Sequence, residues 1–132
     1  MSSLREKLLA LVPGHRSGKP RIGIVGFYGH GNYGDELFFD VFRQYLGDDF
    51  ELVNVVDLPV RPYYSKPVKR VVNSVDAIVI GGGDLIRPWM VDRRYFNPAY
   101  LNKPVFMIGL GVGVLGGEKH QARPESLAQY QE

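Results

Sequence analysis

The pattern of apolar and polar positions divides the chain into short apolar runs and the segments between them. Runs dominated by apolar residues lie at 21–27, 51–56, 77–80 and 105–108. The first is too short for a helix and rich in β-branched residues, which is typical of a strand in a parallel sheet covered on both faces. Helical or long crossover segments separate the runs, so right-handed connections are expected. The pattern predicts an α/β fold, a Rossmann-like parallel sheet of about four or more strands with flanking helices.

A strand, a glycine turn and a helix follow one another within residues 21–46. The turn contains Gly29, Gly31 and Gly34, and Asp35 is the expected N-cap of the helix. The helix should present one wide core-facing stripe, because its apolar residues recur at helical spacing, at Leu37, Phe38, Val41, Phe42, Tyr45 and Leu46.

Three regions are expected along the chain. Residues 1–20 are interpreted as a short amphipathic helix and a basic linker, and residues 21–117 as the Rossmann-like domain. Residues 118–132 form a polar tail with one further helix between Pro124 and Gln131. The apolar run at 8–12 is too short for a signal sequence or a membrane span. The first helix is expected to pack on the domain or on a partner, with membrane-surface contact as the alternative.

Composition limits the function classes. The chain has 132 residues, of which 45% are hydrophobic and 23% charged, as in an ordinary globular domain with one core. A net charge of +2 is too small to indicate nucleic-acid binding. Cysteine is absent, which excludes disulfides and thiolate metal sites and fits a reducing cytoplasm.

Glycines follow the third and fourth predicted strands as well as the first. They occupy 81–83 and then Gly109, Gly111 and Gly113. Such residues can adopt positive φ and let a ligand approach backbone amides, although a close helix-to-strand contact is the alternative. Ligands of open parallel sheets bind outside the carboxyl ends of the strands. We therefore expect these glycine loops to line one crevice that holds a small ligand.

The residues after the third strand add charged and aromatic groups. Asp84 and Arg87 should flank the crevice. The following segment combines arginines, which hold anionic groups, with aromatic rings on which a sugar can stack. An aromatic cover over the sheet, with the arginines in water, is the alternative. The residues concerned are Trp89, Arg93, Arg94, Tyr95 and Phe96.

The first glycine turn also satisfies G-x-G-x-x-G, and Asp57 follows about twenty residues later, as in a dinucleotide-binding fingerprint. That fingerprint needs a helix N-terminus open to a pyrophosphate. Here Asp35 and Glu36 bring two carboxylates to the same amides. A dinucleotide site is therefore disfavoured, and a purely structural tight turn stays open.

Three glycine motifs in a fixed order carry a family resemblance. G-H-G-N-Y-G-D-E-L at 29–37, G-G-G-D-L-I at 81–86 and G-L-G-V-G at 109–113 resemble the polysaccharide pyruvyl transferase family. The likeness runs from about residue 21 to residue 113 and is to the N-terminal half of such an enzyme. Members of the family usually carry proline where this sequence has Val114.

The resemblance implies a two-domain enzyme similar to a B-type glycosyltransferase. Such enzymes transfer pyruvate from phosphoenolpyruvate to sugar hydroxyls as a ketal, in cell-surface or exopolysaccharide biosynthesis. The N-terminal domain would take the saccharide acceptor, which can be lipid-linked, and a C-terminal domain would hold the donor. The resemblance further implies a cytoplasmic location, at the inner face of the membrane, and no cofactor besides the donor substrate. A missing domain or a partner chain would complete the site, and a homo-oligomer is compatible with this plan.

Asp35 is the candidate general base on this half, and a capping carboxylate without catalytic role is the alternative. No metal site is expected, and the isolated chain is expected to be inactive. A free-standing binding or interaction module completed by a partner chain is the alternative function. The candidate substrate-binding residues are Gly29, His30, Gly31, Asn32, Gly34, Glu36, Gly82, Gly83, Asp84, Arg87, Gly111 and Gly113.

Overall fold

The computed structural model describes residues 18–28, 31–55, 68–114, 116–117 and 121–131. Several sequence-based expectations fall outside these residues. They are the N-terminal helix, Gly29, His30 and Asp57. Among the helices of the described ranges, none is long and apolar enough to cross a membrane.

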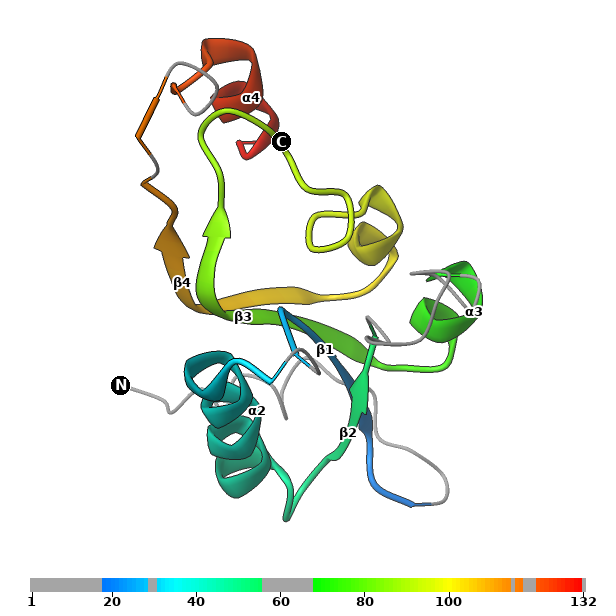
Figure 1. Cartoon of the computed structure of the whole chain (residues 1–132). Coiled ribbons are helices and arrows are strands. Elements are labelled where there is room, and N and C mark those ends of the chain that lie inside the picture. The colour runs from blue at the N-terminus through cyan, green and yellow to red at the C-terminus, as the bar shows by residue number, and fades with distance from the viewer. Residues whose placement is uncertain (1–17, 29–30, 56–67, 115, 118–120, 132) are drawn as a thin grey trace, which may run out of the picture.

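The described residues contain one parallel sheet with the strand order β2-β1-β3-β4 (Figure 1). Ile22 of β1 pairs with Leu52 of β2 on one side and with Ala77 of β3 on the other. The α/β, Rossmann-like parallel sheet predicted from the apolar pattern is confirmed. The strands are β1 Arg21–Val25, β2 Glu51–Asn54, β3 Ala77–Ile86 and β4 Val105–Val112.

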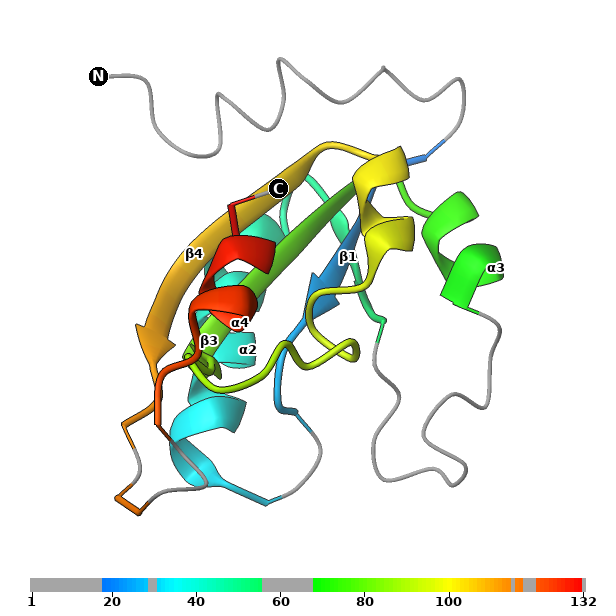
Figure 2. The same cartoon turned by 90° about the horizontal axis from the view of Figure 1, so that it is seen from above.

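Helices cover both faces of the sheet (Figures 1 and 2). The longest of those described, α2 (Tyr33–Leu46), lies on one face, whereas the 3₁₀ helix η1 (Pro98–Asn102) and α4 (Pro124–Gln129) lie on the other. A short helix α3 (Val68–Asn73) leads into β3. Proline is the first residue of both η1 and α4. The backbone amide at this position has no acceptor within the helix, so the missing N–H of proline breaks no hydrogen bond. The helix expected within 124–131 is thus present as α4.

Alternate residues of the strands enter two separate apolar clusters. Ile24 and Val79 point toward α2, where they pack with Phe42 and Leu46. The neighbouring positions of the same strands point to the other face and pack with buried tyrosines. This second cluster contains Val25, Ile78, Ile80, Tyr95 and Tyr100. Both faces are buried along residues 22–25 of β1 and 77–80 of β3, which agrees with the continuously apolar sequence of these segments.

The helix α2 begins earlier than the sequence indicated. Asn32, not Asp35, is the N-cap, and its side-chain oxygen accepts a hydrogen bond from the backbone amide of Gly34 at 3.2 Å. The prediction of Asp35 as N-cap is therefore wrong. Gly31 takes a positive φ of 74° just before the cap, and the helix begins three residues sooner than expected. Asp35 becomes the third residue of the helix, within its first turn.

The strands β3 and β4 are longer than expected, and the glycines lie inside them. Gly81 pairs with Ile108 and Gly83 pairs with Leu110, so the expected glycine loops at 81–83 and at Gly109 and Gly111 are instead paired strand. Figure 1 shows both strands turning away from the plane of β1 and β2 in their second halves. The backbone pairing of β3 with β4 continues through this bend, because glycine has no side chain and can adopt the backbone angles that the bend requires.

Part of this glycine run serves helix packing. Gly82 and Gly109 have φ values of 82° and 62°, and the ring of Phe38 from α2 lies against both. A Cβ added at Gly82 would lie 2.7 Å from the side chain of Phe38, and one at Gly109 would lie 3.2 Å from it. The close helix-to-strand contact left open above therefore holds at these two positions.

Candidate functional site

A pocket opens where β1 and β3 end and α2 begins. It encloses about 350 Å³, and we call it the β1–β3 pocket. The location agrees with the rule that ligands of parallel sheets bind outside the carboxyl ends of the strands. Its lining residues come from the segment after β1, from the start of α2 and from the second half of β3 and the loop that follows. They are Phe27, Asn32, Asp35, Gly83, Asp84, Leu85, Arg87 and Tyr95.

Five of the candidate residues line this pocket together. They are Asn32, Asp35, Gly83, Asp84 and Arg87. The structure thus brings together side chains that lie about fifty residues apart in the sequence.

The other described candidates lie beside the pocket or away from it. Gly111 contacts the pocket residue Asp84, and Gly113 lies near Trp89. Gly82 lies beneath Phe38 and does not line the pocket. Of the remaining candidates, Gly31 lies just before the N-cap of α2, and Gly34 and Glu36 lie in the first turn of this helix.

Asp35 is held against β3 because Gly83 has no side chain. A Cβ added at Gly83 would lie 2.6 Å from Oδ1 of Asp35, inside the contact distance of the two atoms. Gly83 also has a φ of 83°, which disfavours any other residue. The glycine therefore fixes the position of a carboxylate at the mouth of the pocket.

Asp84 supplies a second carboxylate from the next position of β3. Its side chain lies over Gly111 of β4, where a Cβ would collide with Oδ1 of Asp84, and the residue is exposed to solvent. Asp35 and Asp84 thus approach one pocket from a helix and a strand, each beside a glycine.

Arg87 is the positively charged residue of the lining, and a buried carboxylate holds it in place. Nη1 of Arg87 lies 3.6 Å from Oδ2 of Asp92, a residue only 5% exposed. Asp92 also accepts hydrogen bonds from Nε of Arg94 at 2.8 Å and from its Nη2 at 2.5 Å. Burial alone would raise the pKa of the Asp92 carboxyl, but the hydrogen bonds and charge of Arg94, with the charge of Arg87, lower the pKa overall.

The backbone at Arg87 is fixed from the C-terminal side. The hydroxyl of Tyr130, just after α4, accepts from the amide of Arg87 at 3.1 Å and lies 2.8 Å from the carbonyl oxygen of Met90. Sequence reasoning missed both Asp92 and Tyr130. An acidic residue two positions before an arginine was a usable signal for Asp92, whereas no local pattern marked Tyr130.

Tyr28, three residues after β1, is a buried hydrogen-bond donor outside the pocket lining. Its hydroxyl donates to the carbonyl oxygen of Gly81 at 2.5 Å, and its ring packs edge-on against Phe39. Burial, followed by the negative charges of Asp35 and Glu36, raises the pKa of this hydroxyl well above its ordinary value. The group therefore remains protonated at neutral pH and keeps its hydrogen bond.

The expected cluster of arginines and aromatic rings is divided between two places. Tyr95 is fully buried and lines the β1–β3 pocket, and Arg94 is held by Asp92. Arg93 and Phe96 line a different cavity on the face of the sheet opposite α2. The sequence did not separate these groups, because residues one position apart in a loop can point to different sides.

The β1–β3 pocket is rich in hydrogen-bond acceptors. Asp35 and Asp84 contribute carboxylates and Asn32 an amide, while the charge of Arg87 is shared with Asp92. Such a set matches hydroxyl groups, which donate hydrogen bonds, better than it matches a pyrophosphate. Asp35 and Glu36 in the first turn of α2 also oppose an anion at that helix end.

Comparison with known proteins gives one result. The family model described as polysaccharide pyruvyl transferase matches residues 32–129, a span that includes the β1–β3 pocket residues after Phe27 together with Asp92. No curated protein and no solved structure matches the chain. Because the matched span covers most of the sequence, the chain belongs to the polysaccharide pyruvyl transferase family.

Proposed function

We propose that this chain forms the acceptor-side domain of an enzyme that transfers pyruvate from phosphoenolpyruvate to saccharide hydroxyls as a ketal. The observation that carries the proposal is the β1–β3 pocket, with its two carboxylates and one amide in a member of this family. The product would belong to a cell-surface or exopolysaccharide. We place the enzyme in the cytoplasm, at the inner face of the membrane, where a lipid-linked acceptor would be available.

The pocket supports acceptor binding by its chemistry and its size. Carboxylate oxygens accept hydrogen bonds from hydroxyl groups, and Asp84 is exposed enough to meet a ligand that arrives from solvent. A volume of about 350 Å³ lies at the lower end of the range for small-ligand sites. The pocket therefore suits one sugar ring, with the rest of the saccharide in solvent or against another domain.

Asp35 is our candidate for the base that removes a proton from the attacking hydroxyl. Ketal formation requires one proton removed from a hydroxyl and one delivered to the methylene carbon of the donor. Gly83 lets the Asp35 carboxylate lie at the pocket mouth, as a base positioned on a helix requires. The acid and the groups that hold the donor would come from a second domain, arranged as in B-type glycosyltransferases.

The proposal is tested by titrating the isotope-labelled chain with a neutral hexose disaccharide and following the backbone amides by NMR. We expect saturable shifts at Asn32, Gly83 and Asp84, with weak, millimolar affinity. Asp84→Asn and Asp35→Asn should each weaken binding about fivefold or more, because each removes a charged acceptor.

Asp40→Asn is the matched control. Asp40 lies on α2 as Asp35 does, but it is exposed and pairs with Arg43 on the surface. This variant should bind the disaccharide as the wild type does. Equal weakening by Asp40→Asn, or shifts that avoid the pocket, would refute acceptor binding at this site.

A further inference from the structure

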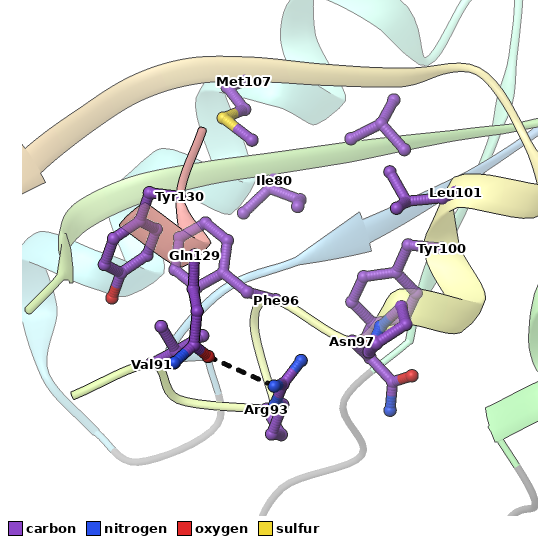
Figure 3. A pocket seen from close by; sticks show the side chains of 12 residues that line it. Ile80, Val91, Arg93, Phe96, Asn97, Tyr100, Leu101, Met107, Gln129 and Tyr130 are labelled. Atoms are coloured by element: carbon purple, nitrogen blue, oxygen red, sulfur yellow. Dashed lines mark hydrogen bonds between the residues drawn. The ribbon is translucent and has the colours of Figure 1, made fainter. Parts of the chain in front are cut away.

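A second cavity lies on the face of the sheet opposite α2 and shares no lining residue with the β1–β3 pocket (Figure 3). It encloses about 180 Å³ between β3, β4, η1 and α4, and we call it the Arg93 cavity. Its lining residues are Ile80, Val91, Arg93, Phe96, Asn97, Pro98, Tyr100, Leu101, Val105, Met107, Gln129 and Tyr130.

The walls of the Arg93 cavity are mostly apolar and partly open to solvent. Ile80 of β3 and Met107 of β4 line the side made by the sheet, and Leu101 lies on η1 (Figure 3). Val105 of β4 also lines this side. Met107 is 57% exposed and Leu101 is 71% exposed. A ligand that removes these apolar groups from water lowers the free energy of the complex.

Arg93 is the one charged residue in this lining. Nη2 of Arg93 donates to Oε1 of Gln129 at 3.2 Å across the cavity (Figure 3). Among the described residues no carboxylate pairs with Arg93, whereas its neighbours Arg87 and Arg94 both pair with Asp92. Of these three guanidinium groups, the one that no described carboxylate neutralises is that of Arg93, which lines the cavity.

We infer that the Arg93 cavity binds a small soluble amphiphile, a short aliphatic chain or single ring that carries a carboxylate or phosphate group. The apolar part would lie against Ile80, Val105 and Met107, and the anion would take hydrogen bonds from Arg93. A cavity of about 150 Å³ is known to hold one benzene molecule, so the volume here suits an apolar group of similar size. The charge of Arg93 selects the anionic member of such compounds, since a guanidinium binds these groups with two hydrogen bonds. This inference does not depend on the proposed function, because it concerns separate residues.

Hexyl phosphate is a suitable probe, with inorganic phosphate and hexanol as its two halves. The isotope-labelled full chain is titrated with each, and the backbone amides are followed by NMR. We expect saturable shifts at residues 91–101, 105–107 and 129–130 with hexyl phosphate, and at least about tenfold weaker binding of either half. Arg93→Gln should weaken hexyl phosphate binding about tenfold.

Arg43→Gln provides the control, since Arg43 is an exposed arginine of α2 on the opposite face of the sheet, and its variant should bind as the wild type does. Met107→Glu, at a position where the side chain is largely exposed, should also abolish binding by repelling the anion. The inference is overturned if no saturable shift occurs, if Arg93→Gln binds equally well, or if only vesicles of anionic phospholipid shift these amides. A dimer in solution that buries the cavity would also overturn it.

Discussion

Gly82 and Gly83 are neighbours in β3, have nearly the same positive φ and serve two different regions of the molecule. Gly82 receives the ring of Phe38 and belongs to the contact between α2 and the sheet. Gly83 receives the carboxylate of Asp35 and lines the β1–β3 pocket. One glycine motif thus combines a packing contact with a candidate site, and the distinction depends on which residue of α2 lies opposite each glycine.

The largest expected effect concerns turnover. The β1–β3 pocket supplies mainly acceptors, and the charge of Arg87 is shared with Asp92, so an anionic donor has no strong binding group there. A second wall is also needed to exclude water and to position the donor. We expect the isolated chain to release no phosphate and form no ketal from phosphoenolpyruvate and a disaccharide. Multiple turnovers, measured by phosphate release, would show that one domain or its self-associated form suffices.

Gly82→Ala should affect folding most among the glycine variants. The added Cβ would lie 2.7 Å from Phe38, and alanine disfavours the φ of 82°. We expect a loss of about 2–4 kcal/mol in the free energy of unfolding, measured by urea denaturation. Gly31→Ala is the control, because Gly31 has a similar φ of 74° but nothing within 4 Å of an added Cβ. If both variants lose the same stability, backbone strain and not the Phe38 contact is responsible.

Asp92→Asn should lower stability by about 1–3 kcal/mol at neutral pH, since it removes the paired charge beside Arg94 and Arg87. Folding lowers the pKa of Asp92 from its ordinary value of 3.8. At pH values above 3.8 the ionised carboxylate therefore stabilises the folded chain. That contribution is lost as pH falls through the lower, folded-state pKa. Denaturation curves of the two proteins should therefore differ above about pH 5 and converge toward acid pH. A constant difference between pH 7 and pH 2 would contradict this assignment.

Asn32→Ala should lower the free energy of unfolding by about 1 kcal/mol, because it removes the side-chain oxygen that accepts from the Gly34 amide at the N-cap of α2. Asp35→Ala should cost less, since Asp35 lies inside the first turn, where its charge interacts with the helix dipole. Urea denaturation of the two variants measures the difference. The opposite order would restore Asp35 as the capping residue.

The sequence predicted the sheet because a short, continuously apolar run is a local feature. It also named five residues of the pocket lining, through the rule that parallel strands end at one edge. It did not predict that β3 and β4 continue through their glycines, since the pairing of Gly81 with Ile108 and of Gly83 with Leu110 joins residues far apart in the sequence. Asp92 was missed although its contact with Arg94, two positions away, was a usable local signal, whereas its burial and its pairing with Arg87 come from the fold.

The most direct test compares saccharide binding by the wild type, Gly82→Ala and Gly83→Ala, measured by NMR titration under conditions where each is folded. We expect Gly83→Ala to weaken disaccharide binding about fivefold or more. The added Cβ would lie 2.6 Å from Oδ1 of Asp35 and would therefore displace the carboxylate. Gly82→Ala should retain nearly wild-type affinity in its folded fraction, with amide shifts at 32–35 and 83–87. Equal loss in both variants, or shifts only around the Arg93 cavity, would contradict the assignment of the β1–β3 pocket as the acceptor site.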